Sequence, residues 1–180
     1  MKNIIITLLS TLGLFAAVTF NACKKDKCKH VSCAYSGTCK DGKCACQIGY
    51  EGEHCETITR DKFKGIYDVN EDGTITGPAQ YAISIESGDK IDRVFIKNFQ
   101  NNFTENIVGV CFRDTLRIYP QVFSDGRSVE GWATIQDTNP LNQHYYQNAI
   151  LTFYYKVTDP NLGFINEFGT GGSGPSVWTK

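Results

Sequence analysis

The sequence predicts a mainly β protein, in which a small cross-linked module is followed by a larger antiparallel β-barrel or β-sandwich. Six of the eight cysteines fall within residues 28–55. Residues 63–180 contain eight short segments rich in Val, Ile, Thr and aromatic residues, and turn-forming residues separate these segments. No stretch of about 15 residues in this part has the apolar spacing of a helix.

Residues 1–22 have the layout of an export signal. Lys2 gives a basic start, residues 4–20 are mostly apolar and uncharged, and small residues precede position 23. The apolar run is shorter than the ~20 residues that a transmembrane helix needs. A cleaved signal peptide is therefore favoured over an uncleaved membrane anchor.

Cys23 indicates which kind of export signal this is. The sequence FNAC, which ends at Cys23, resembles a bacterial lipobox, where cleavage before the cysteine leaves that residue to carry acyl chains. The resemblance implies that Cys23 is lipidated and that residues 23–27 tether the protein to a membrane. A chance cysteine after an ordinary signal peptide is the alternative. Because a lipoprotein matures outside the cytoplasm, disulfides are expected to persist.

The six cysteines of residues 28–55 have the spacing C-x4-C-x5-C-x4-C-x-C-x8-C. So short a segment cannot bury a sufficient core, and each cross-link would contribute about 2–4 kcal/mol. Zinc would favour C-x2-4-C pairs with histidine partners, and the single residue between Cys44 and Cys46 does not suit it. A redox pair would need C-x-x-C, which the segment lacks. The sequence therefore favours disulfides.

The spacing, GTC at 37–39 and CxxGYxGxxC at 46–55 together resemble an EGF-like domain over residues 28–55. Its glycines supply the positive φ that the tight last loop needs. The calcium-binding version of the domain has an aromatic residue where this chain has Lys43, so no calcium is expected there. The module is expected to act as a spacer or as a contact module. The spacing leaves many connectivities open, and the resemblance implies the pairs Cys28–Cys39, Cys33–Cys44 and Cys46–Cys55.

Residues 56–62 are polar and are predicted to be a linker. Residues 63–180 are long enough to bury a real core. Their strands are predicted over 64–69, 80–87, 93–99, 106–112, 115–119, 129–135, 149–157 and 176–179. Short strands with tight turns favour an antiparallel meander, either a barrel or a sandwich. A closed barrel would hide the strand edges and could leave an interior pocket.

Four short motifs of this domain are GIYDV (65–69), YAISI (81–85), VFIKNF (94–99) and LRIYPQ (116–121). They resemble the calycin-like, lipocalin-like C-terminal domains of small lipoproteins from the Bacteroidetes phylum. The resemblance implies a barrel and this bacterial lineage, and it brings no catalytic residue with it.

The stretch DVNEDGTI (68–75) matches the start of an EF-hand calcium loop. Asp68, Asn70 and Asp72 would be the calcium ligands. The position that should hold a bidentate glutamate is Ala79, and no helical pattern flanks the stretch. A hairpin turn built on Asp-Gly is therefore favoured, with calcium as the alternative.

The consecutive aromatic residues Phe153, Tyr154 and Tyr155 must point to alternating faces of their strand. About half of the aromatic side chains in this region are expected in the core. For the others an ordinary surface position is favoured, with a pocket or a contact surface as the alternative. The glycine-rich stretch GTGGSG (169–174) lacks the Lys-Ser/Thr of a phosphate loop and is predicted to be a flexible loop before the last strand.

Cys111 lies in an apolar alternating strand, where a buried thiol behaves as a small hydrophobe. Nothing in the sequence ties it to His144 as a catalytic pair. No carboxylate pair, Ser-His-Asp set or metal cluster stands out, so neither an enzyme nor a cofactor is predicted.

The charge is close to balanced, with 18 Lys and Arg against 19 Asp and Glu, which does not favour nucleic acid as a partner. The sequence therefore predicts a non-enzymatic outer membrane lipoprotein of the bacterial cell envelope, which faces either the periplasm or the cell surface. Its partners would be the membrane, through the lipid, and a protein or glycan that contacts the β domain. The alternative is a lipocalin-like carrier with a small hydrophobic ligand inside the barrel.

Overall fold

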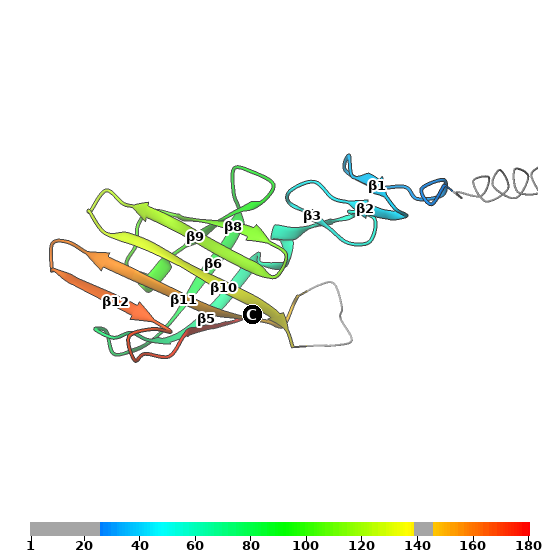
Figure 1. The fold of residues 1–180 in the computed structure, drawn as a ribbon. Helices are drawn as coiled ribbons and strands as arrows, with labels where there is room; N and C mark the ends of the chain where they lie inside the picture. The colour runs from blue at the N-terminus through cyan, green and yellow to red at the C-terminus, as the bar shows by residue number, and fades with distance from the viewer. Residues whose placement is uncertain (1–25, 139–145) are drawn as a thin grey trace, which may run out of the picture.

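The computed structural model describes residues 26–138 and 146–180, and Figure 1 shows their arrangement. A small disulfide-linked module projects from one end of an antiparallel β-barrel. These two ranges contain two short 3₁₀ turns and no α-helix, and they include no helix long and apolar enough to cross a membrane. The predicted signal peptide and Cys23 lie outside the described residues.

The first module is two short hairpins held by disulfides. Strand β1 (Thr38–Lys40) pairs with β2 (Lys43–Ala45), and β3 (Tyr50–Glu51) pairs with β4 (Thr57–Ile58). The three disulfides join Cys28 to Cys39, Cys33 to Cys44 and Cys46 to Cys55. These are the pairs that the EGF-like resemblance implies, so that prediction is confirmed.

The segment predicted as a linker, residues 56–62, is ordered into the fold. It contains β4 and a 3₁₀ turn, η1 (Thr59–Lys62), and both end residues of that turn are buried. Its polar composition concealed this, because the polar groups of Arg60 and Lys62 bond to the barrel and to the first module instead of to water.

The barrel has eight strand positions. Its strands are β5 (Gly65–Asp72), β6 (Pro78–Ser87), β7 (Arg93–Lys97), β8 (Ile107–Phe112), β9 (Thr115–Val122), β10 (Ser128–Asp137), β11 (Ala149–Asp159), β12 (Phe164–Phe168) and β13 (Ser176–Thr179). Strands β5 to β11 pair antiparallel in chain order, and β13 closes the ring between β11 and β5. The fold is therefore a closed barrel and not a sandwich.

The eighth strand position is interrupted. Strand β12 pairs with the second half of β11, and β13 pairs with its first half, so both occupy the same edge of β11. Residues 169–175 leave the barrel wall between them. The eight strands predicted from the sequence correspond to β5 to β11 and to β13. Strand β12 was not predicted. The segment FINEF escaped notice because it is short and two polar residues interrupt its apolar pattern.

Aromatic side chains fill the barrel interior. Phe99, Phe153, Tyr155, Phe168 and Trp178 are each at most 3% exposed. Their rings form a connected cluster with centroid separations from 4.2 Å to 6.3 Å. Edge-to-face and offset contacts of this kind add about 0.5–1.5 kcal/mol per pair beyond area burial.

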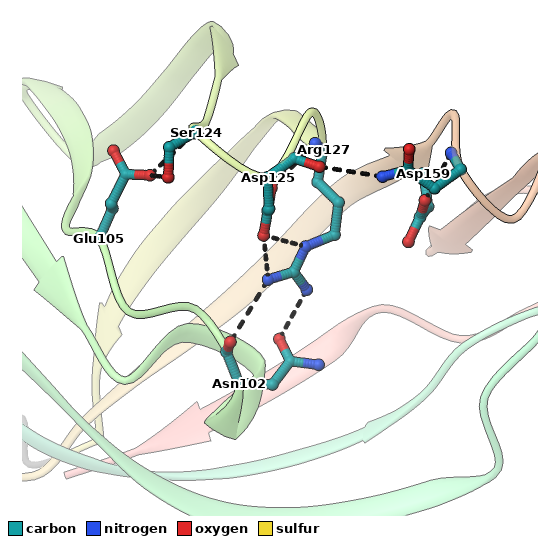
Figure 2. A network of polar contacts seen from close by, with 7 residues as sticks. Asn102, Glu105, Ser124, Asp125, Arg127 and Asp159 are labelled. Atoms are coloured by element: carbon teal, nitrogen blue, oxygen red, sulfur yellow. Dashed lines mark hydrogen bonds and ion pairs between the residues drawn. The ribbon is translucent and has the colours of Figure 1, made fainter.

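The end of the barrel opposite the first module is closed by polar contacts between its loops (Figure 2). Arg127, in the β9–β10 turn, bonds to the Asp125 carboxylate at 2.7 Å and to Oδ1 of Asn102 at 2.9 Å. The Ser124 hydroxyl and backbone N–H donate to Glu105 at 2.6 Å and 2.8 Å. These contacts tie the β7–β8 loop to the β9–β10 turn.

Candidate functional site

A polar cluster lies within the largely apolar interior that the structure describes, and its centre is the carboxylate of Glu71 on β5. This side chain is buried and accepts hydrogen bonds from Tyr81 at 2.8 Å and from Tyr155 at 2.7 Å. The Ser176 hydroxyl donates a third at 2.6 Å, and the Trp178 indole N–H in turn donates to that hydroxyl at 2.7 Å. The cluster thereby joins β5, β6, β11 and β13 beside the interruption of the eighth strand.

The role of this cluster is structural, because its hydrogen bonds hold four strands together. Burial, and next the neighbouring Glu71 carboxylate, raises the pKa of both Tyr81 and Tyr155, so the two phenols remain donors at neutral pH. Each hydroxyl in the cluster has an acceptor, which is the condition under which buried polar groups are tolerated. Glu71 was not predicted from the sequence, although its alternation with Tyr67 and Val69 places it on the inner face.

The candidate calcium ligands lie on the opposite face of the same strand. Asp68, Asn70 and Asp72 are exposed on β5 and alternate with buried residues, so their side chains form a row along a groove of about 990 Å³. Residues two apart on a strand are separated by about 6.7 Å, so a row does not surround one ion. The stretch is a strand that runs into a hairpin with β6, which confirms the hairpin interpretation.

The most distinctive outer surface is an aromatic pair on adjacent strands. Trp132 of β10 lies directly opposite Tyr154 of β11, and the two rings stack with centroids 4.5 Å apart and an interplanar angle of 14°. Trp132 remains 45% exposed. Because Tyr154 covers one face of the indole, the exposed surface of Trp132 lies on its other face and its edges.

Charged side chains border this pair on two sides. On β9, Arg117 lies opposite Trp132, and its guanidinium lies over the ring of Tyr119 at 5.2 Å. On the other side, Lys156 of β11 pairs with Glu130 of β10 at 2.9 Å. Glu167 of β12 is the cross-strand neighbour of the same lysine. Strands β9, β10 and β11, which carry most of these groups, lie side by side in Figure 1.

A hollow of about 340 Å³ opens among these side chains. Its walls include Arg117, Glu130, Trp132, Tyr154 and Lys156. This volume lies at the small end of the range for small-molecule sites, which is about 300–1,000 Å³. We call these five residues and the hollow between them the Trp132 surface.

The glycine-rich loop after β12 supports the aromatic pair from behind. Gly169 has a φ of +85°, and a Cβ at this position would collide with the Tyr154 ring. The loop is also bonded internally, since the Ser173 hydroxyl donates to the carbonyl of Glu167 at 2.7 Å and the Gly169 N–H donates to the carbonyl of Gly174 at 2.8 Å. The predicted loop is present, and its internal hydrogen bonds define one conformation for it.

Lys62 joins the two parts of the molecule. Its Nζ lies 2.7 Å from Glu51 of the first module and 2.7 Å from Asp114 of the β8–β9 turn. Burial alone lowers the pKa of this lysine, but its hydrogen bonds to Asp114 and Glu51 outweigh burial and raise that pKa above its ordinary value. The charged ammonium therefore links the module to the barrel.

Three further contacts reinforce this junction. The Thr59 N–H donates to the Gly49 carbonyl at 2.9 Å. A Cβ on Gly49 would lie 2.6 Å from a methyl of Ile91, so this glycine permits close packing against the β6–β7 turn. Arg60 donates to the carbonyl of Lys90 in the same turn at 2.6 Å. The first module is thus docked against the barrel and does not hang from a free tether.

Cys111 is buried on β8 and has no disulfide partner among residues 26–138 and 146–180, as the sequence predicts. Burial raises the pKa of its thiol to about 12, which leaves almost no thiolate at neutral pH. His144, the histidine weighed as its partner, lies outside the described residues.

The three consecutive aromatics of β11 alternate as predicted. Phe153 and Tyr155 are buried in the core, whereas Tyr154 faces outward into the stack with Trp132. Trp132 itself was not predicted as a surface residue from the sequence. The available signal was its position in VEGWATI, where the inward residues Ala133 and Ile135 place Trp132 on the outside.

Comparison with known proteins identifies the first module. The family model described as a teneurin-like EGF domain matches residues 30–57. Together with the three disulfides, this match makes the module a teneurin-like EGF domain. The match covers this module and leaves the barrel outside it. No solved structure matches the chain.

Proposed function

We propose that this protein is a non-enzymatic, lipid-anchored binding protein of the bacterial cell envelope, and specifically an outer membrane lipoprotein. In this proposal Cys23 carries the lipid, the EGF domain is a spacer, and the barrel contacts a partner. The calycin-like motifs and the lipobox-like FNAC support an origin in Bacteroidetes lipoproteins of this kind.

The observation that carries the binding role is the contrast between the barrel's interior and its exterior. The described interior is packed with aromatic side chains, and the polar groups of the Glu71 cluster within it are hydrogen-bonded, which leaves little room for a carried molecule. The exterior presents a stacked aromatic pair with charged neighbours. Exposed aromatics of this kind are enriched where proteins meet partners. Recognition through the outer face is therefore favoured over the lipocalin-like carrier.

The docked EGF domain supports the spacer role. Its contacts with the barrel through Lys62 and Gly49 fix the direction in which the barrel extends from the N-terminal segment. A rigid spacer of this type would hold the outer face of the barrel away from a membrane surface.

Lipid labelling tests the anchoring part of the proposal. The full chain is produced in a bacterium fed an alkyne fatty acid, and fluorescent conjugation and membrane fractionation follow. We expect the wild type and a Cys111→Ala control to take up label and to sediment with membranes, and a Cys23→Ala variant to do neither. Equal membrane association of all three proteins without label would contradict lipidation at Cys23.

A further inference from the structure

We propose that the Trp132 surface binds an uncharged sugar residue of a glycan. This inference rests on the proposed function and names the ligand class for the outer face of the barrel. It follows from three properties of the surface, which are its stacked aromatic pair with an exposed indole, its balanced charges and its small size.

The exposed indole of Trp132 favours a ligand that has a flat apolar face. Trp132 is held in one orientation by its stack on Tyr154, and Tyr154 is itself backed by Gly169. A preorganised ring of this kind loses little conformational freedom when a ligand covers it. The C–H face of a pyranose ring is apolar and of similar extent to an indole, so it can stack on the exposed side of Trp132.

The charged side chains around the aromatic pair favour a ligand that also carries hydrogen-bonding groups. Arg117 and Lys156 are donors, whereas Glu130 and Glu167 are acceptors, and all four border the hollow. A purely apolar ligand would remove these charges from water without replacing their hydrogen bonds, which is costly. Vicinal hydroxyl groups both donate and accept, and they can satisfy both kinds of side chain.

The charges of the side chains around the hollow cancel, and this favours an uncharged ligand. Two cationic and two anionic side chains border the hollow, so their formal charges cancel. A phosphate, sulfate or uronate would meet the carboxylates of Glu130 and Glu167, and an amine would meet Arg117 and Lys156. A neutral hexose or pentose avoids both repulsions, so the surface is complementary to a neutral polysaccharide and not to a charged one.

The size of the surface favours a sugar over a protein partner. A standard protein interface buries about 800 Å² on each side, and charged residues are depleted at its centre. Here ionised side chains stand one strand or two residues from the aromatic pair. The hollow of about 340 Å³ suits one or two sugar rings better than an interface core.

Affinity electrophoresis tests the proposal. The chain from residue 24 onward, which contains every described residue, is run in native gels that contain dextran, mannan, xylan or hydroxyethyl cellulose, with alginate as the charged comparison. We expect retardation by at least one neutral polymer and none by alginate. Trp132→Ala should weaken the affinity about tenfold or more. Phe112→Ala, which removes another exposed aromatic ring, should leave it unchanged.

A second measurement covers the case in which Trp132→Ala disturbs the fold. The chain has two tryptophans, and Trp178 is fully buried. Acrylamide quenching of the wild-type fluorescence therefore reports mainly on Trp132. Oligosaccharides of the retarding polymer should reduce that quenching, and Arg117→Ala should reduce the protection.

Three results would overturn the proposal. The first is no retardation in any neutral gel, together with no signal on an array of neutral oligosaccharides. The second is retardation by alginate alone. The third is retardation by a neutral polymer that Trp132→Ala leaves unchanged. Each of these leaves the binding role itself intact, because a protein partner could still use the outer face. The proposed function fails separately, if the barrel retains a hydrophobic molecule or if Cys23 carries no lipid.

Discussion

Glu71 is a buried carboxylate on the inner face of the barrel, and three hydroxyl groups donate to it. Replacement by alanine leaves Tyr81, Tyr155 and Ser176 without their acceptor in a buried site. Hydrogen bonds to a charged group contribute about 1.5–3 kcal/mol, so we expect Glu71→Ala to lower the free energy of unfolding by about 3 kcal/mol. Urea denaturation of the two proteins measures the difference.

The next outward residue on the same strand gives the matched control for Glu71. Asp72 is exposed, so Asp72→Ala should change the free energy of unfolding by no more than about 0.5 kcal/mol. Equal effects of the two substitutions would show that the polar cluster does not lock the barrel.

The Cys111 thiol gives a prediction about pH. Because burial raises its pKa to about 12, the fraction of thiolate remains very small between pH 7 and pH 9. Native protein from residue 24 onward should therefore react slowly with a thiol reagent at both pH values. After denaturation without a reductant, one thiol per chain should react, because the other six cysteines are paired. Seven reactive thiols would rule out the disulfides.

Among the elements, the turn η1 is the one that holds the EGF domain to the barrel. Lys62→Met keeps most of the apolar stem and removes the ammonium that bonds to Glu51 and Asp114. We expect a loss of about 1–2 kcal/mol, because both carboxylates keep partial access to water. In ¹⁵N relaxation, the EGF domain should tumble more independently of the barrel in this variant. Lys64→Met, which removes a more exposed ion pair with Asp61, should leave the tumbling unchanged.

The raised pKa of Lys62 sets the sign of its pH dependence. A cation whose pKa is higher in the folded state stabilises that state fully below its unfolded pKa of about 10.4, and the contribution disappears as pH rises through the folded value. Lys62 should therefore stabilise the junction throughout the neutral range. Joint tumbling of the two parts in Lys62→Met, with unchanged stability, would contradict the account of this junction.

The loops that close the far end of the barrel should respond to acid. Hydrogen bonding to Arg127 lowers the pKa of Asp125, and bonding to Ser124 lowers that of Glu105. A depressed carboxyl pKa stabilises the fold above the unfolded value of about 4, and that stabilisation is lost as pH falls through the folded value. The difference in Tm between the wild type and Arg127→Met should therefore shrink between pH 5 and pH 2.

Arg113→Met is the control for the far-end loops, because this arginine contacts the Phe112 ring and its removal leaves the Arg127 contacts in place. Its difference from the wild type should not vary with pH over the same range. If the Tm difference between the wild type and Arg127→Met is also constant between pH 5 and pH 2, the contact between Arg127 and Asp125 does not contribute to the stability of the fold.

The elements also show which parts of this fold are readable from sequence. Strands β5 to β11 were predictable because inward apolar residues alternate with outward polar ones, as in the run from Tyr81 to Ile85. Strand β12 was not, because Asn166 is inward-facing and its amide bonds to the hydroxyl of Thr76 in a distant hairpin. Local pattern cannot reveal a polar residue whose partner is brought close by the closed barrel.

The candidate surface was predictable only in part for a similar reason. Alternation along β11 predicts that Tyr154 faces outward. The stack with Trp132 depends on the register between β10 and β11, and the support from Gly169 depends on the interrupted eighth strand. Both arise from pairing between strands, which a single sequence does not specify. The disulfide pairs, by contrast, were correctly implied by a family resemblance that local features carry, namely the cysteine spacing with GTC (37–39) and CxxGYxGxxC (46–55).

At the scale of the whole molecule, the described structure combines a stapled, docked EGF domain with a barrel whose interior is occupied. This combination is the central claim, because a filled barrel directs any binding to the outer face. The proposed lipid on Cys23 would supply the membrane contact. Stability rests on three disulfides in the small domain and on barrel closure in the large one.

Native mass spectrometry of residues 24–180, exported to a bacterial periplasm, tests this claim most directly. The account predicts a mass lower than that of the fully reduced chain by six hydrogens, as three disulfides require. It also predicts that no hydrophobic molecule remains bound under gentle ionisation. A retained hydrophobic adduct would mean that the barrel opens to hold a ligand, and it would contradict the proposal of recognition through the outer face.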